Sequence, residues 1–220
     1  MAKVNKRTAA NRELALKYQE PQNIEDAIKA LKSFKEPKFD QSIEACVHLG
    51  IDPRQADQQL RGSISMPNGV GKTARVICFC NEEKVAEAKE AGAIEAGGAE
   101  LITKISEGWM EFDVAVASPD MMRDVSKLGR VLGPKGLMPS PKAGTVTADV
   151  GTAVKEYGAG KIEYRNDDGG NVHCIVGKMS FSQEDLEENL NFFVQIIDKI
   201  RPAAAKGQYI KKFVVSGTMT

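Results

Sequence analysis

The sequence has no long apolar run, and its first residues are not hydrophobic. A membrane-spanning helix needs about 20 consecutive apolar residues, and no such stretch occurs in the 220 residues. Residues 1–7 are polar and basic, which does not fit a secretory signal. We therefore expect a cytoplasmic protein without membrane contact. An apolar content of 42% and a charged content of 27% are typical of a folded globular chain of one or two domains.

Cysteine and histidine are few, and none of them stands at the spacing of a metal site. The chain has four cysteines and two histidines: Cys46, Cys78, Cys80, Cys174, His48 and His173. A zinc site needs paired ligands such as Cys-x-x-Cys, whereas Cys78 and Cys80 alternate within an apolar run. We predict reduced, mostly buried thiols, no metal and no cofactor. Neither histidine has an obvious nucleophile to activate, so no enzyme constellation is visible.

The chain also lacks a basic excess, because its 30 Lys and Arg balance 30 Asp and Glu. This balance argues mildly against a nucleic-acid-binding protein. The distribution argues the other way: residues 1–38 contain nine basic against five acidic residues, 66–124 six against eleven, and 125–148 four against none. A basic segment is most simply a solvated face, but the segregation of charge keeps a nucleic-acid surface open.

Hydrophobic periodicity predicts alternating helices and strands, and hence an α/β fold class. Helices are expected over 1–20, 23–34 with Asn23 as its cap, 84–91, 100–106, 119–127 and 150–157, and from Ser182 onward, where Ser182 and Asp185 form an N-terminal box. Strands are expected over 39–49, 61–66, 74–80, 112–117, 161–165, 171–176 and 209–215, with a hairpin turn at 167–170.

Glycine-containing connections bracket the central α/β block on both sides. Gly69 and Gly71 precede it, and Gly158 and Gly160 follow it. This arrangement predicts an inserted domain over 68–159 that is joined by two hinge strands to a discontinuous domain made of 1–67 and 160–220.

The segment from Gly69 to Thr73 looks like the end of a phosphate-binding loop. The full motif requires a glycine five positions before Gly71, where this chain has Met66. It also lies between a strand and a helix, whereas a strand is expected after Lys72. A nucleotide-binding enzyme is therefore kept only as the alternative function, and a protein-interaction scaffold without an RNA role as a third.

The most distinctive segment covers residues 127–146. It has seven Gly or Pro between Gly129 and Gly144, and its cations Arg130, Lys135 and Lys142 have no acidic neighbours in sequence. Such a segment predicts a stiff, irregular loop whose backbone can approach a partner closely. From the residues alone, the three cations could contact phosphates or could simply keep a surface loop soluble, and neither role is favoured over the other.

The segment 129–145, Gly-Arg-Val-Leu-Gly-Pro-Lys-Gly-Leu-Met-Pro-Ser-Pro-Lys-Ala-Gly-Thr, closely resembles the signature of the L1 (L-one) family of ribosomal proteins. Further matches follow in order along nearly the whole chain, at 38–40, 49–54, 61–62, 108–113, 163–167, 176–178 and 218–219. The resemblance implies a discontinuous first domain, an inserted Rossmann-like second domain, and a monomeric, non-catalytic protein of the large ribosomal subunit.

The resemblance also implies partners and site residues. The partners would be large-subunit stalk rRNA, exit-site tRNA during its release, and the mRNA of the protein's own operon, which it would repress. The main RNA surface would comprise Lys38, Phe39 and Ser42 on the first strand, Arg165, Lys178 and Ser180 in the C-terminal strands, and Thr218 and Met219. Arg130, Lys135 and Lys142 would be secondary contacts. Thr220 stands where the family usually has glycine.

The chemistry of these residues suits a folded RNA, because cations meet phosphates while hydroxyls meet 2′-hydroxyls and base edges. From the residues alone, purely structural roles stay open as well. Phe39 and Met219 could pack in the core, and Ser42 and Ser180 could lie on a solvated strand face.

Overall fold

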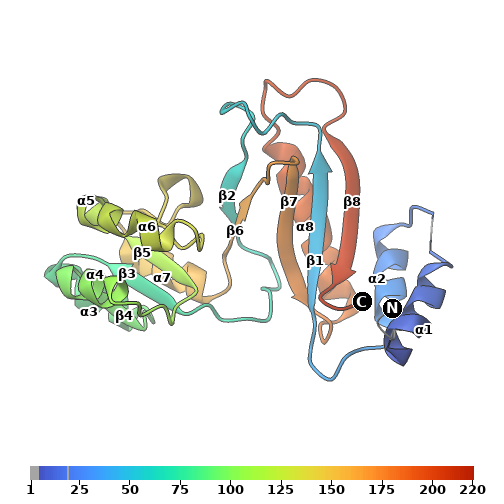
Figure 1. Ribbon diagram of the computed structural model, residues 1–220, viewed down its shortest axis with the longest axis horizontal. Coiled ribbons are helices and arrows are strands. Elements are labelled where there is room, and N and C mark those ends of the chain that lie inside the picture. Colours follow the sequence, from blue (N-terminus) through green and yellow to red (C-terminus); the bar gives the residue numbers. More distant parts are fainter. Residues whose placement is uncertain (1–4, 19) are drawn as a thin grey trace. The chain divides into compact units, whose positions relative to one another are not determined.

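The structure, a computed structural model, describes residues 5–18 and 20–220. The chain packs into two compact units. Within the described residues, unit 1 lies in Met1–Leu60, Met66–Gly71 and Arg165–Thr220, and unit 2 lies in Arg61–Ser65 and Lys72–Tyr164. Figure 1 shows the elements of each unit.

Unit 1 contains three helices and three strands within the described residues. The helices are α1 (Lys6–Ala15), α2 (Ile24–Ser33) and α8 (Gln183–Lys199), and the strands are β1 (Ser42–Leu49), β7 (Asn171–Lys178) and β8 (Ile210–Gly217). The strands form an antiparallel sheet in the order β7-β1-β8. The predicted strands over 39–49, 171–176 and 209–215 and the long C-terminal helix are therefore confirmed, with shifted ends.

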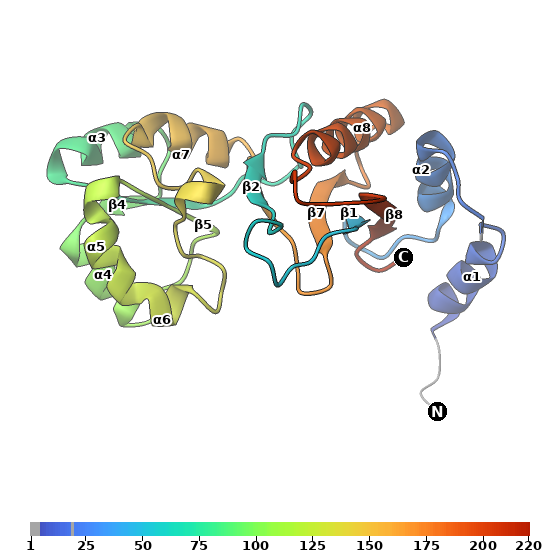
Figure 2. The ribbon, with the colours of Figure 1, turned by 90° about the horizontal axis from the view of Figure 1, so that it is seen from above.

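The core of unit 1 lies between one face of this sheet and the helices α2 and α8 (Figure 2). Ile43, Ala45 and Val47 of β1 are buried, while Glu44 between them is exposed, as the period of a strand requires. One face of α8 meets the sheet through Leu186, Leu190, Phe193 and Ile197. Full burial of each such side chain contributes about 1.5–3 kcal/mol to folding.

The N-terminal box of α8 is confirmed. The Ser182 hydroxyl accepts a hydrogen bond from the Asp185 N–H at 3.0 Å and donates one to the Asp185 carboxylate at 2.6 Å. Asn23 does precede α2, but its side chain makes no capping hydrogen bond. Helix α1 ends at Ala15, so the prediction of a helix to residue 20 was too long.

The prediction that the first strand begins at residue 39 was wrong, because β1 begins at Ser42. Lys38 and Phe39 lie in the loop before it. The Asp40 carboxylate accepts hydrogen bonds from the N–H and the hydroxyl of Ser180, at 3.1 and 2.8 Å. These bonds tie the loop to the chain beyond β7 and keep it out of the strand ladder.

The predicted hairpin turn at 167–170 exists, but its flanking strands do not form a hairpin. Gly170 N–H donates to the Asp167 carbonyl at 3.1 Å, which closes the turn. Beyond one bridge between Asn166 and Val172, β7 pairs with β1, whereas the strand before the turn pairs with a strand of unit 2. The Asn166 side chain accepts from Leu60 N–H at 2.7 Å and so diverts the chain away from β7.

Unit 2 contains two small sheets and a series of short helices. Its strands are β2 (Arg61–Ile64), β3 (Val76–Phe79), β4 (Glu95–Gly97), β5 (Val114–Ala117) and β6 (Ile162–Arg165), and the last residue of β6, Arg165, already belongs to unit 1. Its helices are α3 (Glu82–Glu90), α4 (Ala99–Ser106), α5 (Met122–Val125), α6 (Gly129–Leu132) and α7 (Val150–Gly158), with single 3-10 turns at Pro119–Met121, Ser126–Leu128 and Pro141–Ala143. Strand β2 pairs with β6.

The main sheet of unit 2 is parallel, in the order β4-β3-β5, and helices cover both of its faces (Figure 2). All four residues of β3 are buried, as expected for a central parallel strand. One face packs against α3 and α7 through a cluster that includes Cys78, Val154 and Tyr157. The other packs against α4 and the segment 121–138 through a cluster that includes Phe79 and Leu132.

Two predictions for unit 2 were incomplete. The segment 129–144 was expected to be an irregular loop, yet it includes helix α6, because Leu132 is fully buried and packs under the sheet. Strand β4 was not predicted at all. It is three residues long, Glu95–Gly97, which is too short to show a period of two.

Candidate RNA-binding surface

Ser42 and Thr218 join the start of β1 to the end of β8. The Thr218 hydroxyl accepts a hydrogen bond from Ser42 N–H at 3.2 Å and donates one to the Ser42 carbonyl at 3.1 Å. The Thr218 N–H donates to the same carbonyl at 3.1 Å. Two hydroxyl residues distant in sequence are thereby held at one end of the sheet.

Lys178 brings a positive charge to the same place. It lies opposite Ser42 in the register of β1 and β7, and its Nζ donates to the Ser42 hydroxyl at 2.9 Å. No ion pair of Lys178 is found among the described residues. A half-buried ammonium group that bonds only a neutral hydroxyl keeps its charge available to an anion such as phosphate.

Two apolar side chains are exposed at this end of the sheet. Phe39 is 47% exposed and Met219 is 56% exposed, so neither packs in the core. Exposed rings are the surfaces on which unpaired RNA bases stack. A core-packing role for these two residues is therefore excluded. Lys38, next to Phe39, is exposed as well.

Gln41 was not singled out from the sequence, yet it connects the three pieces of this surface. Its side chain is fully buried, and its Oε1 accepts from Met219 N–H at 2.9 Å. Its backbone carbonyl accepts from Met179 N–H at 2.9 Å. Gln41 continues the inward period of β1 that contains Ile43 and Ala45, so a polar residue at a predicted core position was the signal that could have identified it.

Arg165 is not brought into this cluster. It is the exposed last residue of β6, directly before the bridge between Asn166 and Val172. Val172 lies opposite Val47 in the register, five residues along β1 from Ser42, which is about 17 Å at the rise of a strand. Ser42, Lys178, Ser180, Thr218 and Met219 therefore share one end of unit 1, while Arg165 follows the opposite end of β1 and β7.

The sheet face opposite the helices presents further side chains that were not predicted from the sequence. Strand pairing puts one set on this face: Glu44, Cys46, His48, His173, Ile175, Lys212, Val214 and Ser216. Each of them is half-buried or exposed. The alternation of β8, which turns Lys212 and Val214 away from the core, was the available signal for this face.

Polar side chains contact both histidines on that face. The His48 Nδ1 lies 2.8 Å from the Asn171 side-chain oxygen, and the Asn171 amide donates to the Asp167 carboxylate at 2.9 Å. The His173 Nε2 lies 3.6 Å from the same carboxylate. Side-chain and backbone hydrogen bonds from Asn171 hold the pKa of Asp167 below its usual range, so the carboxylate is ionised at neutral pH.

In unit 2, the cations of the distinctive segment are exposed. Arg130 lies on α6, Lys135 follows it and Lys142 lies on the turn Pro141–Ala143. Within the described residues no ion pair neutralises any of the three. The Tyr157 hydroxyl donates to the Ala143 carbonyl at 2.5 Å and anchors the end of the segment to α7.

The bracketing glycines differ from one another. Gly69, Gly71 and Gly160 have φ of 65°, 70° and 106°, in the region that favours glycine. Gly158 is instead the last residue of α7. A Cβ on Gly71 would lie 2.6 Å from Lys178 Cγ, so this glycine also leaves room for the lysine.

The buried side chain of Asn189, on α8, holds the first connection to unit 1. Its amide donates to the Gly69 carbonyl at 3.0 Å and to the Val176 carbonyl at 2.8 Å, and its oxygen accepts from Asn68 N–H at 3.1 Å.

Lys72 is not placed as a phosphate-loop lysine. Its Nζ and the Arg75 guanidinium each lie 3.0 Å from the Asp113 carboxylate. The hydrogen bond from Arg75, reinforced by Lys72, lowers the pKa of Asp113 to about 2. The strand β3 follows at Val76, so no helix N-terminus is available to hold a phosphate.

The remaining side chains show no metal or membrane chemistry in the part of the chain that the structure describes. No group of three or more His, Cys, Asp or Glu is placed to hold a metal ion there, and no helix of 5–18 and 20–220 is long and apolar enough to cross a membrane. All four cysteines are free. Three of them are buried, which agrees with the expectation of mostly buried thiols, and Cys46 is half-buried.

Comparison with known proteins supplies the family. The model of the Ribosomal protein L1p/L10e family matches residues 31–220. The large ribosomal subunit protein uL1 of Kosmotoga olearia (strain ATCC BAA-1733 / DSM 21960 / TBF 19.5.1) is 55% identical over 196 residues, covering 89% of this chain and 85% of the relative. This chain therefore belongs to the L1 family of ribosomal proteins, which are structural and not enzymatic.

Proposed function

We propose that this protein is a constituent of the large ribosomal subunit and binds the stalk region of large-subunit rRNA through unit 1. The observation that carries the proposal is the cluster at one end of the sheet, where the Lys178 ammonium, the Ser42 and Thr218 hydroxyls and the exposed Phe39 and Met219 lie together. The cluster combines a cation for phosphate, hydroxyls for ribose and apolar groups for bases. Its partner is a folded RNA with unpaired bases.

Arg165 extends this proposed interface. Because it follows the far end of β1 and β7, an RNA that contacts both Lys178 and Arg165 must cross about 17 Å of protein surface. The sheet face with Lys212 and His173 offers a path between them. Such a length fits a junction of helices better than a single short loop.

The finer roles belong to the same proposal. Arg130, Lys135 and Lys142 of unit 2 would make a secondary contact with RNA, including exit-site tRNA whose release the protein assists. The two units would act as domains that move on Gly69, Gly71, Gly158 and Gly160. Because Asn189 anchors Gly69, motion on the first connection would begin after that glycine, at Gly71.

The binding proposal is tested with the full chain and a short stalk rRNA fragment, against a scrambled RNA of equal length, over a series of salt concentrations. We expect tight binding of the stalk fragment only. Lys178→Ala should weaken it and lower the slope of log K against log salt by about 0.7–0.9, the value of one phosphate contact. Lys206→Ala, at an exposed lysine between α8 and β8, is the matched control. Equal, weak binding of both RNAs would leave only a nonspecific basic patch.

Repression of the protein's own operon is tested separately. A transcript that carries the operon's leader should compete with the stalk fragment for the same surface, and Lys178→Ala should weaken both. A leader transcript that does not compete would remove the repressor role while leaving rRNA binding intact.

A further inference from the structure

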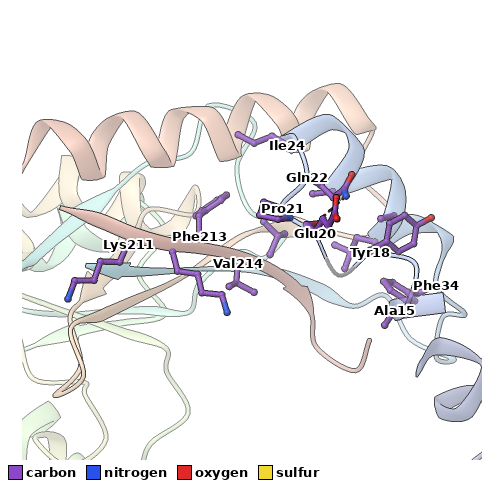
Figure 3. Close-up of a pocket in the computed structure, with 15 residues that line it drawn as sticks. Ala15, Tyr18, Glu20, Pro21, Gln22, Ile24, Phe34, Lys211, Phe213 and Val214 are labelled. Atoms are coloured by element: carbon purple, nitrogen blue, oxygen red, sulfur yellow. Dashed lines mark hydrogen bonds between the residues drawn. The ribbon is translucent and has the colours of Figure 1, made fainter. Parts of the chain in front are cut away.

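A groove of about 640 Å³ lies in unit 1 between strand β8 and the segment that includes α1 and α2 (Figure 3). The helical wall contributes apolar side chains that include Tyr18, Ile24 and Phe34, and the strand wall contributes Phe213 and Val214. The family match begins at residue 31, so most of the helical wall lies outside the matched region. This groove is separate from the cluster around Lys178.

The strand side of the groove is an open sheet edge. Among the described strands, β8 pairs only with β1. Thr218 N–H bonds the Ser42 carbonyl, and in an antiparallel pair the bonded residues recur every two positions. The N–H and C=O groups of Phe213 and Val215 therefore point away from β1 and into the groove, whereas Lys211 lies at a shift in the register. An edge of this kind is a template for a further strand.

The side chains determine which strand would fit. Phe213 and Val215 share the sheet face of the helices, beside α2, so the facing strand would present apolar side chains there. Lys211 and Lys212, at the start of β8, are exposed and have no ion pair in the described part of the chain. They would attract a negative charge at that end of the added strand.

We propose that this groove binds an extended apolar peptide segment with acidic residues at one end, contributed by a partner protein and added to β8 as a fourth strand. Main-chain hydrogen bonds to an open edge provide affinity in this mode, and pockets for alternate side chains provide selectivity. RNA fits less well, because most of the lining is apolar and Glu20 lies on the helical wall.

The test uses the full chain and a fluorescein-labelled peptide of alternating valine and threonine with two glutamates at one end. Two further peptides carry N-methyl groups on alternate residues, one set in each register. Because only alternate peptide N–H groups face β8, we expect one N-methylated peptide to lose at least tenfold in affinity and the other to bind nearly as the parent does. Amide resonances of Phe213 and Val215 should shift on binding.

A charge reversal supplies the protein-side control. Lys211→Glu should weaken the parent peptide at least fivefold, whereas Lys199→Glu, at an exposed lysine that ends α8, should not. Equal binding of the two N-methylated peptides would overturn strand addition. Displacement of the peptide by a short single-stranded RNA would assign the groove to nucleic acid. If the protein self-associates and the peptide reverses this association, the occupant of the groove would be a second copy of the chain. Each of these results refutes the proposal.

Discussion

Replacement of Gln41 by leucine should weaken RNA binding while leaving the free energy of unfolding nearly unchanged. The variant loses the hydrogen bond from Met219 N–H to Gln41 Oε1, which contributes about 1 kcal/mol. It also removes the Gln41 Nε2 group, which is buried without a hydrogen-bond partner among the described residues, and a buried unsatisfied donor costs about 1–3 kcal/mol. The two effects oppose each other. We therefore expect the free energy of unfolding to change by no more than about 1 kcal/mol, or about 2–4 °C in Tm.

RNA affinity should fall in the same variant, because Met219 is no longer fixed. Arg7 still donates to the Met219 carbonyl at 2.9 Å, but the N–H side is released. Ordering one residue's backbone on binding costs about 1–2 kcal/mol, which corresponds to an increase of roughly five- to thirtyfold in Kd. The assays are thermal unfolding by circular dichroism and titration of the stalk rRNA fragment at fixed salt.

Gln58→Leu is the matched control for this prediction. Gln58 is also a buried glutamine, but its side chain accepts from Asp52 N–H at 2.9 Å and donates to Gln55 at 2.8 Å, in the loop before β2. Its loss should lower stability by about 1–2 kcal/mol and leave RNA affinity within about twofold. The prediction would be refuted if Gln41→Leu bound RNA like the wild type, or if it unfolded more than about 8 °C early.

Three further predictions concern stability and reactivity. Asp113→Asn should cost about 1–2 kcal/mol at pH 7, because the pKa of Asp113 is lowered from 3.8 to about 2 in the folded protein. The contribution of the carboxylate to stability is complete above pH 3.8 and is lost as pH falls to about 2, so the difference from the wild type should vanish over this window. A constant difference would contradict the ion-pair origin. Gly71→Ala should weaken RNA binding, because the added methyl group would displace the Lys178 side chain. The control is Gly92→Ala, which also has a positive φ but lies in open space and should affect stability alone. Equal RNA binding by the two variants would argue against displacement of Lys178. Under native conditions a thiol reagent should modify only Cys46, because the other three cysteines are buried. The reaction should be slow, because partial burial raises the pKa of the Cys46 thiol. Rapid modification of several thiols would contradict the burial of these cysteines.

The elements that could be predicted from sequence are those with a clear period and a local boundary signal. β1 alternates buried and exposed residues from Ile43 onward, and α8 combines a helical period with the Ser182 cap, so both were found. Strand β4 and helix α6 gave no such signal. Glu95–Gly97 is too short to have a period, and the helical turn at Leu132 forms because the core accepts that side chain.

The candidate site could be predicted only in part, for a related reason. Ser42, Thr218 and Met219 come from the resemblance to a family, since no local pattern brings residues this distant together. Gln41 and Lys212 become visible only when the strand register fixes which face each one occupies. The loop before β1 was misread because the bonds from Ser180 to Asp40 link positions 140 residues apart.

The hydrogen bonds between Ser42 and Thr218 span 176 residues of sequence, and this separation has a consequence for synthesis. During translation, unit 2 has all of its strands before β8 exists, so it can fold while the first strand of unit 1 still lacks one neighbour. The proposed RNA surface then forms only once the chain has been made through Met219. A nascent or prematurely terminated chain would have a folded unit 2 but could not bind RNA through unit 1. RNA binding would therefore indicate that synthesis had passed Met219.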